Sequence, residues 1–285
     1  MTARGTGNSR TDADGKRGTL TASAGGPSYE TIVVEREGSV GTVRINRPDK
    51  LNALNAVVRR EIAQAMDRLA DDDAVRVAIL CGTGEKAFAA GADVSEFAGR
   101  TAGEQREVYR RRRVYDAVAA FPKPLIAAIH GFCLGGGVEL ALACDVRVAD
   151  PSARFGQFEI RLGLIPGAGG TQRLARLVGP GQAARIALSG DVVDAAEAHR
   201  IGLVEILADE GEHLERAREL AGRMARWSPF ALGLVKESLR AAAETPLAEG
   251  LALEKELFLA AFASHDGREG VRAFVEKRRP EFRGR

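Results

Sequence analysis

The sequence predicts an α/β protein in which alternating strands and helices are followed by a helical C-terminal layer. Short apolar runs such as Val75–Cys81 and Leu125–Ile129 are typical of buried parallel strands. Segments with helical spacing of apolar residues alternate with these runs through the first two thirds of the chain. The last third contains several helix-start signals and no comparable strand pattern, which indicates an α/β core with a helical addition.

Composition narrows the class of protein. The 285 residues include 41 Lys and Arg against 39 Asp and Glu, a net charge of +2, which gives no global signature of nucleic-acid or membrane binding. No apolar run approaches the roughly 18 residues of a membrane span, and no signal-peptide core is evident. No metal-ligand spacing occurs, so no metal is expected. The three cysteines lie in apolar segments and suggest reduced thiols in the cytoplasm: Cys81, Cys133 and Cys144.

The first 28 residues have almost nothing to bury, since they are mostly Gly, Ser, Thr, Ala, Arg and Asp. We expect residues 1–28 to be a disordered tail. Recurring arginines make a transit peptide the alternative, but two aspartates and the lack of an amphipathic face argue against it.

The ordered part begins near Tyr29. Strands are expected at Thr31–Arg36 and Ser39–Asn46, followed by a loop that enters a helix. That helix is predicted from apolar residues at helical spacing: Val57, Val58, Ile62, Met66 and Leu69. Small residues after Lys86 then leave the backbone bare, which suits a ligand lying along it.

The second half continues the alternation before it becomes helical. Residues 102–121 are expected to form a helix that contains four consecutive arginines, Arg110–Arg113. Short extended segments follow at Asp145–Ala149 and Ala153–Gly156. Helix-start patterns then divide the C-terminal third, which should end near Arg279: Asp194–Glu197, Ser228-Pro229 and Thr245-Pro246. We expect one folding unit, with a core over residues 29–225 and a helical region over residues 226–285.

The most informative stretch is Leu125–Asp145, where a strand, a glycine-rich turn and a helix follow one another. The free N–H groups at such a helix N-terminus can meet negative charge, and glycines allow a ligand to approach the backbone. Glu139 lies in the apolar helix just after the glycines. A buried acid is costly, so this carboxylate suggests a functional site.

A second acid, Glu159, lies 20 residues later and precedes another glycine cluster, Gly167–Gly170. One strand and a turn between the two acids can bring both to one cleft. Two carboxylates beside glycine-rich backbone suit a reaction that moves protons while a carbonyl oxygen gains charge. The alternative is that one glutamate is an ordinary salt-bridged residue.

Other glycine motifs are not supported. The sequence at Gly131–Gly137 lacks the GxGxxG order of a dinucleotide site, no Walker Lys-Ser/Thr follows the glycine clusters, and GxSxG is absent. His130 ends the apolar strand, and we interpret it as a structural histidine, with a place near the site as the alternative.

A set of motifs in order resembles the enoyl-CoA hydratase/isomerase, or crotonase, superfamily over about Tyr29 to Phe282. The motifs are Arg47–Asn55, Lys86–Val94, Ile126–Asp145, Phe155–Leu174, Ser189–Val204 and Glu269–Phe282. The resemblance implies a crotonase-like core of repeated ββα units with a C-terminal helical trimerisation region.

The resemblance also implies an acyl-CoA thioester as substrate. The backbone N–H groups of Ala92 and Gly136 would form the oxyanion hole, Glu139 and Glu159 would be the catalytic acids, and Gly167 would help hold the reacting water. No further cofactor is expected, because coenzyme A is part of the substrate.

The same resemblance implies the coenzyme A contacts and the assembly. Ala90 and Asp93 would border the coenzyme, while Phe274 and Lys277 would help close its site, possibly across a subunit boundary. The expected assembly is a homotrimer or a dimer of trimers.

Three departures from the commonest hydratase pattern are Phe158, His130 and Val138. Phe158 precedes the second acid in place of the usual proline, which leaves the acyl preference open. Both glutamates are retained, so the expected activity is enoyl-CoA hydratase, reversible addition of water to a trans-2-enoyl-CoA. The alternatives are an enoyl-CoA isomerase or another crotonase-type activity, and, more remotely, an RNA-binding homologue that uses Arg110–Arg113 or Arg59-Arg60.

Overall fold

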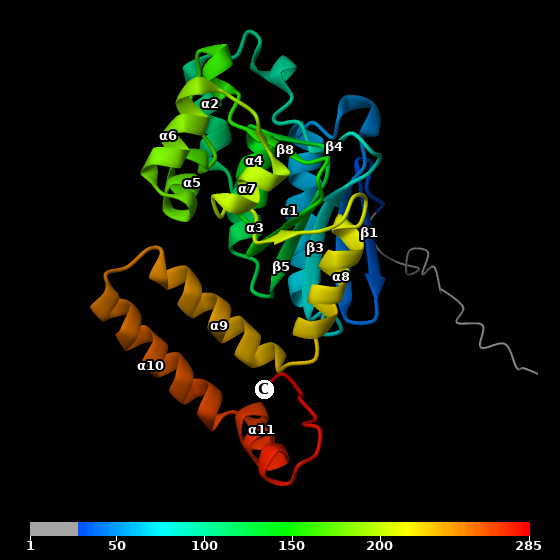
Figure 1. The fold of residues 1–285 in the computed structure, drawn as a ribbon, viewed down its shortest axis with the longest axis vertical. Coiled ribbons are helices and arrows are strands. Elements are labelled where there is room, and N and C mark those ends of the chain that lie inside the picture. The colour runs from blue at the N-terminus through cyan, green and yellow to red at the C-terminus, as the bar shows by residue number, and fades with distance from the viewer. Residues whose placement is uncertain (1–27) are drawn as a thin grey trace, which may run out of the picture.

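The computed structural model describes residues 28–285. The predicted tail over residues 1–28 therefore lies outside the described residues, except for Ser28. In Figure 1 two sheets and their covering helices form the main body, and three C-terminal helices form a separate arm below it. Within residues 28–285, no helix combines the length and the apolar character that a membrane span needs.

The larger sheet has six strands in the order β1-β2-β3-β5-β7-β10. Only the β1–β2 pair is antiparallel, because a short turn joins these two strands, and the remaining pairs of this sheet are parallel. Strands β3 and β5 are buried along their whole length, as expected for central parallel strands. The strand bounds are β1 Ile32–Glu37, β2 Val40–Ile45, β3 Val77–Gly82, β5 Leu125–Ile129, β7 Val146–Ala149 and β10 Ile206–Leu207.

The smaller sheet has the order β4-β6-β8-β9, and its first three strands are parallel. Its bounds are β4 Ala87–Ala89, β6 Phe132–Leu134, β8 Arg154–Gly156 and β9 Val193–Asp194. The chain passes three times from a strand of the large sheet to one of the small sheet and then into a helix. This repetition confirms the expected ββα core, and it brings the carboxyl ends of β4, β6 and β8 to one edge, where ligands commonly bind.

Helices cover the sheets of the core. Helix α1 begins at the predicted place, where the Asn55 side chain accepts a hydrogen bond from the N–H of Val58, and buries one face against the sheet. Helix α1 spans Ala56–Asp71. Further helices of the core are α4 Gly136–Leu142, α5 Gly170–Val178, α6 Pro180–Ser189, α7 Ala195–Arg200 and α8 His213–Met224.

The prediction of a single helix over residues 102–121 is wrong. The structure has two helices, α2 Ala102–Arg110 and α3 Val114–Ala119, separated by an extended backbone at Arg111 and Arg113. Arg113 pairs with Asp116, and Arg112 pairs with Asp67 on α1. The break lets adjacent arginines reach acids in different directions, whereas a continuous helix would stack like charges on neighbouring turns.

The C-terminal arm consists of α9 Pro229–Ala242, α10 Leu247–Ala263 and α11 His265–Val275. Ser228 caps α9 with Pro229 at its first position, as predicted. Two boundaries differ from the prediction. Pro246 is the N-cap residue of α10 rather than its first helical residue, and α11 ends at Val275 rather than near Arg279, because Lys277 adopts a left-handed backbone with φ 53°.

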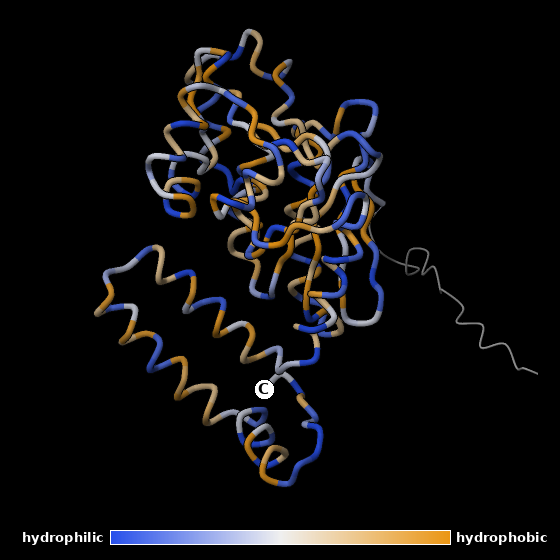
Figure 2. Tube along the Cα trace, in the orientation of Figure 1, coloured by the Kyte–Doolittle hydropathy of each residue, from blue (hydrophilic) through white to orange (hydrophobic). Residues whose placement is uncertain are grey.

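Helix α10 has apolar residues on all sides, and they remain exposed in the single chain. Figure 2 shows hydrophobic stretches along this helix and the neighbouring α9. Large exposed side chains on α10 include Leu247, Leu251, Phe258, Leu259 and Phe262. A helix with this pattern usually packs against another surface.

Candidate functional site

Two backbone N–H groups come together where β4 and β6 end. Gly91 has φ 106° and Gly135 has φ 49°, and both backbone conformations favour glycine. They place the N–H of Ala92 next to that of Gly136, the first residue of α4. A Cβ built on Gly136 would lie 3.3 Å from the Ala92 nitrogen. Among the described residues, neither N–H donates a backbone hydrogen bond. The structure therefore brings the predicted oxyanion pair together.

Glu139 lies in the first turn of α4 and is 3 % exposed. Its Oε1 accepts two backbone hydrogen bonds, at 2.6 Å from Ala168 and at 2.9 Å from Gly170. Burial raises the pKa of Glu139, although these hydrogen bonds and the nearby Arg113 oppose the rise. The bonds fix the carboxylate through one oxygen, which leaves Oε2 for a ligand.

Glu159 is the first residue of a short 3₁₀ helix, Glu159–Leu162, that follows β8. Its Oε1 lies 2.9 Å from the point that a Cβ on Gly135 would occupy, so the carboxyl group stands against the oxyanion turn. Its Oε2 is buried with no hydrogen-bond partner in residues 28–285. Burial raises the pKa of Glu159 to about 7, and the Glu139 carboxylate contributes to that rise. The two acids therefore lie near enough for the charge of one to affect the other, as the spacing of 20 residues allowed.

Gly167 belongs to the loop that leads into α5. Its carbonyl oxygen accepts a hydrogen bond from Arg113 at 3.0 Å, and a Cβ on it would lie 2.5 Å from the Tyr109 hydroxyl. The next residue, Ala168, donates to Glu139. Gly167 therefore lies in the loop that contacts the Glu139 carboxylate, where the reacting water is expected to bind.

Two polar side chains of the site were missed from the sequence. Tyr115 on α3 is 7 % exposed, and its hydroxyl lies 2.8 Å from the point that a Cβ on Gly136 would occupy. Gln157 is fully buried, and its Nε2 lies 2.6 Å from the corresponding point on Gly170, close to Glu139. Gln157 stands two residues before the second acid, so its position was a usable signal. Tyr115 lies in a segment that was predicted as a helix, and no sequence signal marked it as part of the site.

The predicted coenzyme contacts fall into two groups. Ala90 and Asp93 flank the oxyanion turn, where Asp93 accepts a hydrogen bond from Ser95 and pairs with Arg47 at 3.5 Å. Phe274 is 85 % exposed on α11, at the opposite end of the molecule from β4 (Figure 1). Lys277 follows α11 directly, so one chain does not bring the two groups together.

The two departures at His130 and Phe158 serve packing in this chain. His130 is buried after β5 and stacks on His213, with ring centroids 4.6 Å apart, while His213 bonds to Asp150 at 2.7 Å. The Phe158 ring lies beneath the Arg161 guanidinium, at 3.9 Å from the ring centroid. The stacking agrees with the interpretation of His130 as a structural histidine, but within residues 28–285 neither of its buried ring nitrogens has a hydrogen-bond partner.

The arginines considered for nucleic-acid binding are largely paired. Arg110, Arg112 and Arg113 each form an ion pair with an acid, and so does Arg59 with Glu96. These pairs reduce the positive charge available to a phosphate backbone.

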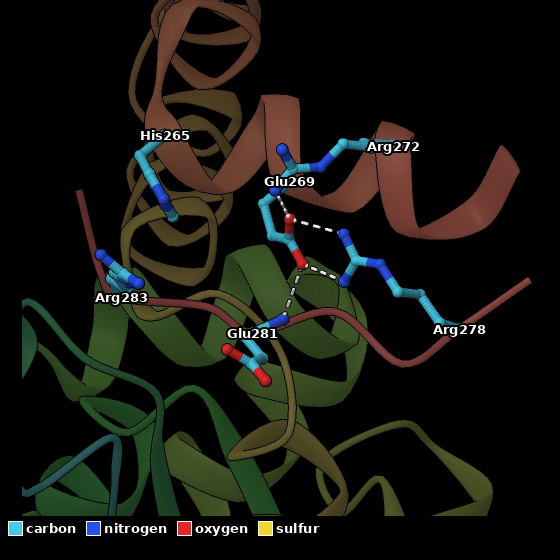
Figure 3. A pocket seen from close by; sticks show the side chains of 6 residues that line it. All are labelled: His265, Glu269, Arg272, Arg278, Glu281 and Arg283. Carbon is cyan, nitrogen blue, oxygen red and sulfur yellow. Dashed lines mark hydrogen bonds and ion pairs between the residues drawn. The ribbon is translucent and has the colours of Figure 1, made fainter. Parts of the chain in front are cut away.

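A hollow of about 340 Å³ lies on the C-terminal arm, and neither Glu139 nor Glu159 is among the residues that line it. Figure 3 shows the side chains around the hollow. Glu269 at its centre accepts hydrogen bonds from Arg272 and Arg278 and from the N–H of Glu281. Because these charged groups form hydrogen bonds with one another, we interpret this cluster around Glu269 as a structural contact that holds the C-terminal tail, and we call it the Glu269 clip. Across residues 28–285, no group of three or more His, Cys, Asp or Glu side chains is arranged to hold a metal ion.

Comparison with known proteins agrees with this geometry. A model of the enoyl-CoA hydratase/isomerase family matches residues 35–285. A probable enoyl-CoA hydratase of Rhizobium meliloti is 46% identical over 260 residues, which cover 90% of this chain and 100% of that protein. The crotonyl-CoA hydratase of Syntrophomonas wolfei is 42% identical over 256 residues, covering 90% and 98%.

Solved structures show the same fold. An enoyl-CoA hydratase subunit from Geobacillus kaustophilus superposes with a TM-score of 0.86 at 41% identity, covering 90% of this chain and 99% of that chain. An enoyl-CoA hydratase from Bacillus anthracis gives 0.85 at 38% identity, with 90% and 100% coverage.

Proposed function

The chain belongs to the enoyl-CoA hydratase/isomerase family, and on this premise we propose that it is an enoyl-CoA hydratase. It adds water reversibly across the 2,3 double bond of a trans-2-enoyl-CoA and gives a 3-hydroxyacyl-CoA. The observation that carries the proposal is the approach of two acids, the buried Glu139 and the half-buried Glu159, to the N–H groups of Ala92 and Gly136, which form no backbone hydrogen bond within residues 28–285.

The oxyanion hole receives the charge that the reaction creates. When the oxygen of water bonds to C3, the electrons of the double bond move through C2 onto the thioester oxygen, which becomes enolate-like. The N–H groups of Ala92 and Gly136 donate to that oxygen. Fixed donors aimed at developing charge are often the largest contribution to an enzyme's rate.

The two acids then divide the proton transfers. Glu139 holds the water through its Oε2, since its Oε1 is bonded to Ala168 and Gly170, and accepts a proton from it. Glu159 delivers a proton to C2. Its pKa of about 7 leaves a large protonated fraction near neutral pH, which suits a general acid. Gly167 shapes the loop that encloses the water.

The retention of both acids favours hydration over double-bond migration. An isomerase needs only one group to carry a proton between two carbons, whereas hydration also needs a partner for the water. The coenzyme moiety lies along Ala90 and Asp93. No further cofactor is needed, because water and the two carboxyl groups supply the chemistry.

We place the rest of the coenzyme site across a subunit boundary. Exposure of Phe274 and its distance from β4 within one chain both support this arrangement. The exposed apolar surface of α10 supports a trimer, or a dimer of trimers, as the assembly that provides the neighbour. The free thiols of the three cysteines, all buried in the described chain, support a cytoplasmic location.

The test is a panel of trans-2-enoyl-CoA substrates of increasing acyl length, with product identification by mass spectrometry. We expect the ultraviolet band of the conjugated thioester to disappear as the mass rises by one water. Migration of the double bond without a gain of mass would show an isomerase instead. No change with any member of the panel would reject the proposed activity.

A further inference from the structure

The hydroxyl of Tyr115 occupies an unusual position beside the oxyanion pair. A Cβ on Gly136 would stand 2.8 Å from the Tyr115 oxygen and 3.3 Å from the Ala92 nitrogen. The phenol and the Ala92 nitrogen therefore face the same side of the Gly136 backbone, and an oxygen held by the Ala92 and Gly136 N–H groups would lie near the phenol. Because Gly136 carries no side chain, the phenol can approach the backbone at this place.

The phenol has no competing partner. Among residues 28–285, the Tyr115 hydroxyl forms no hydrogen bond to another side chain. The residue is only 7 % exposed, but its hydroxyl oxygen is not sealed from solvent as Glu159 Oε2 is, so a ligand can reach it. Tyr115 lies in helix α3, where Val114, Ala117 and Val118 are buried as well, so the helix that carries the phenol is anchored in the core.

The phenol can donate but is poorly suited to act as a base. Burial raises the pKa of Tyr115 well above its usual value, and the nearby carboxylates of Glu139 and Glu159 add to the rise. The hydroxyl therefore stays protonated at neutral pH. A neutral donor next to two carboxylates has a use where negative charge develops on a substrate oxygen.

We propose that Tyr115 donates a third hydrogen bond to the thioester oxygen, beside the N–H groups of Ala92 and Gly136. This inference rests on the proposed function for its substrate. The phenol keeps its proton throughout; the double-bond electrons reach the thioester oxygen during attack of water at C3, and they return when C2 takes its proton. The hydrogen bond strengthens as that oxygen gains charge, so its effect belongs mainly to kcat.

The experiment compares wild-type protein with Tyr115→Phe, which removes one oxygen atom. We expect kcat for hydration of crotonyl-CoA to fall about 10-fold or more with little change in KM, somewhat less than the loss of a main oxyanion donor. Tyr29→Phe is the matched control, because Tyr29 lies before β1 and, within residues 28–285, its hydroxyl accepts a hydrogen bond from Arg68 alone. That variant should keep the wild-type rate.

A second measurement does not depend on hydration. A bound 2,4-hexadienoyl-CoA absorbs at longer wavelength when its thioester carbonyl is polarised. We expect a red shift in wild-type protein, a smaller one in Tyr115→Phe, and almost none in Gly136→Ala, whose Cβ would stand 2.8 Å from the Tyr115 hydroxyl and 3.3 Å from the Ala92 nitrogen and so crowd the oxyanion hole. A dienoyl shift that depends on Tyr115 in a protein without hydratase activity would support this inference and reject the proposed function.

Equal shifts and equal kcat values in wild-type and Tyr115→Phe proteins would overturn the inference while the proposed function stands, and so would the absence of any shift in the wild-type protein. If Tyr115→Phe does not fold, 3-fluorotyrosine replaces the chain's three tyrosines. The more acidic phenol should then enlarge the red shift, and an unchanged shift would contradict the role of Tyr115.

Discussion

At the scale of single residues, two glutamates of the same chemistry acquire different properties from their surroundings. Glu139 is fixed by two backbone N–H groups, which partly oppose the effect of burial on its pKa. Glu159 has no such partner at Oε2 and stands near the charge of Glu139, so its pKa rises to about 7. Environments that separate two pKa values assign the acid and the base of a reaction.

If the two acids serve one event, their removal should not be additive. We expect Glu139→Gln and Glu159→Gln each to lower kcat for hydration by roughly 10² or more, and the double variant to lose much less than the product of the two. The solvent-deuterium exchange of acyl α-protons separates their roles, because it needs Glu159 and can persist without Glu139. A single variant that hydrates at the wild-type rate, or effects that multiply, would show that the glutamates do not act together.

The raised pKa of Glu159 also predicts a cost in stability. The folded protein favours the neutral carboxyl, so stability declines as pH rises from about 4.5 to about 7 and stays lower above that range. We expect Glu159→Gln to raise the free energy of unfolding by about 1–2 kcal/mol at pH 8.5, after allowance for solvent screening, and to have little effect at pH 4.

Thermal melting at the two pH values measures this difference. Glu107→Gln is the control, because Glu107 is exposed and pairs only with Arg110, and it should change stability by less than about 0.5 kcal/mol at either pH. A Glu159→Gln variant that is no more stable than wild-type protein at pH 8.5 would contradict the electrostatic explanation.

At the scale of elements, the site depends on three strands that end together. Ala92, Gly136 and Glu159 follow β4, β6 and β8 in turn, and parallel pairing of those strands makes them neighbours. Local signals in the sequence, the apolar strand and the glycine turn, predicted the strand, turn and helix that carry Gly136 and Glu139. The place of Ala92 beside Gly136 came from the family resemblance, and the pairing order of the strands was not predicted, because no local pattern records it.

The break between α2 and α3 shows what local patterns missed. Residues 102–121 have helical character throughout, but the ion pairs of Arg112 and Arg113 with distant and local acids favour an extended connection. That connection starts α3 at Val114 and so directs Tyr115 toward Gly136. Since such tertiary contacts leave no periodic trace in the sequence, Tyr115 could not be assigned to the site before the structure was known.

The ion pairs of the Glu269 clip hold the C-terminal tail, so we expect the tail to become more mobile when Glu269 is replaced. Hydrogen bonds from Arg278, then Arg272, hold the pKa of Glu269 well below its usual range. Its contribution to stability is therefore present above the unfolded pKa of about 4.3 and is lost as pH falls below it. We expect Glu269→Gln to speed amide hydrogen exchange over residues 265–285 at pH 7 by about 10-fold, with the core unchanged.

The matched control is Glu276→Gln. Glu276 is exposed and pairs only with Arg278, so exchange in the tail should stay near the wild-type rate. If exchange over residues 265–285 is the same in wild-type and Glu269→Gln proteins, the ion pairs around Glu269 do not hold the tail.

At the scale of the whole molecule, a single chain leaves the apolar side chains of α10 exposed and keeps the two groups of predicted coenzyme contacts apart. The arm of α9, α10 and α11, with the tail that follows it, is joined to the core by few contacts, such as the bonds of Lys236 to Asp145 and of Arg76 to the carbonyl of Phe282. The abundance of apolar residues in this region was visible in the sequence. Which of these apolar residues would contact a neighbouring subunit depends on the orientation of the arm relative to the core. Composition alone does not determine that orientation.

The last prediction concerns that assembly. Light scattering of the wild-type protein at micromolar concentration should give about three or six times the chain mass of 30.3 kDa. Phe258 is 64 % exposed on α10, and Phe258→Arg places a charge where a buried contact is expected, so the mass should fall toward that of one chain. If Phe274 and Lys277 of a neighbour complete the coenzyme site, the same variant should raise KM for crotonyl-CoA more than it lowers kcat. Val33→Arg on the edge strand β1 is the control and should keep both mass and KM, because β1 lies on the main body, away from the arm (Figure 1). A wild-type protein with the mass of one chain would reject the trimer, and a dissociated variant with unchanged KM would show that each chain binds its coenzyme alone.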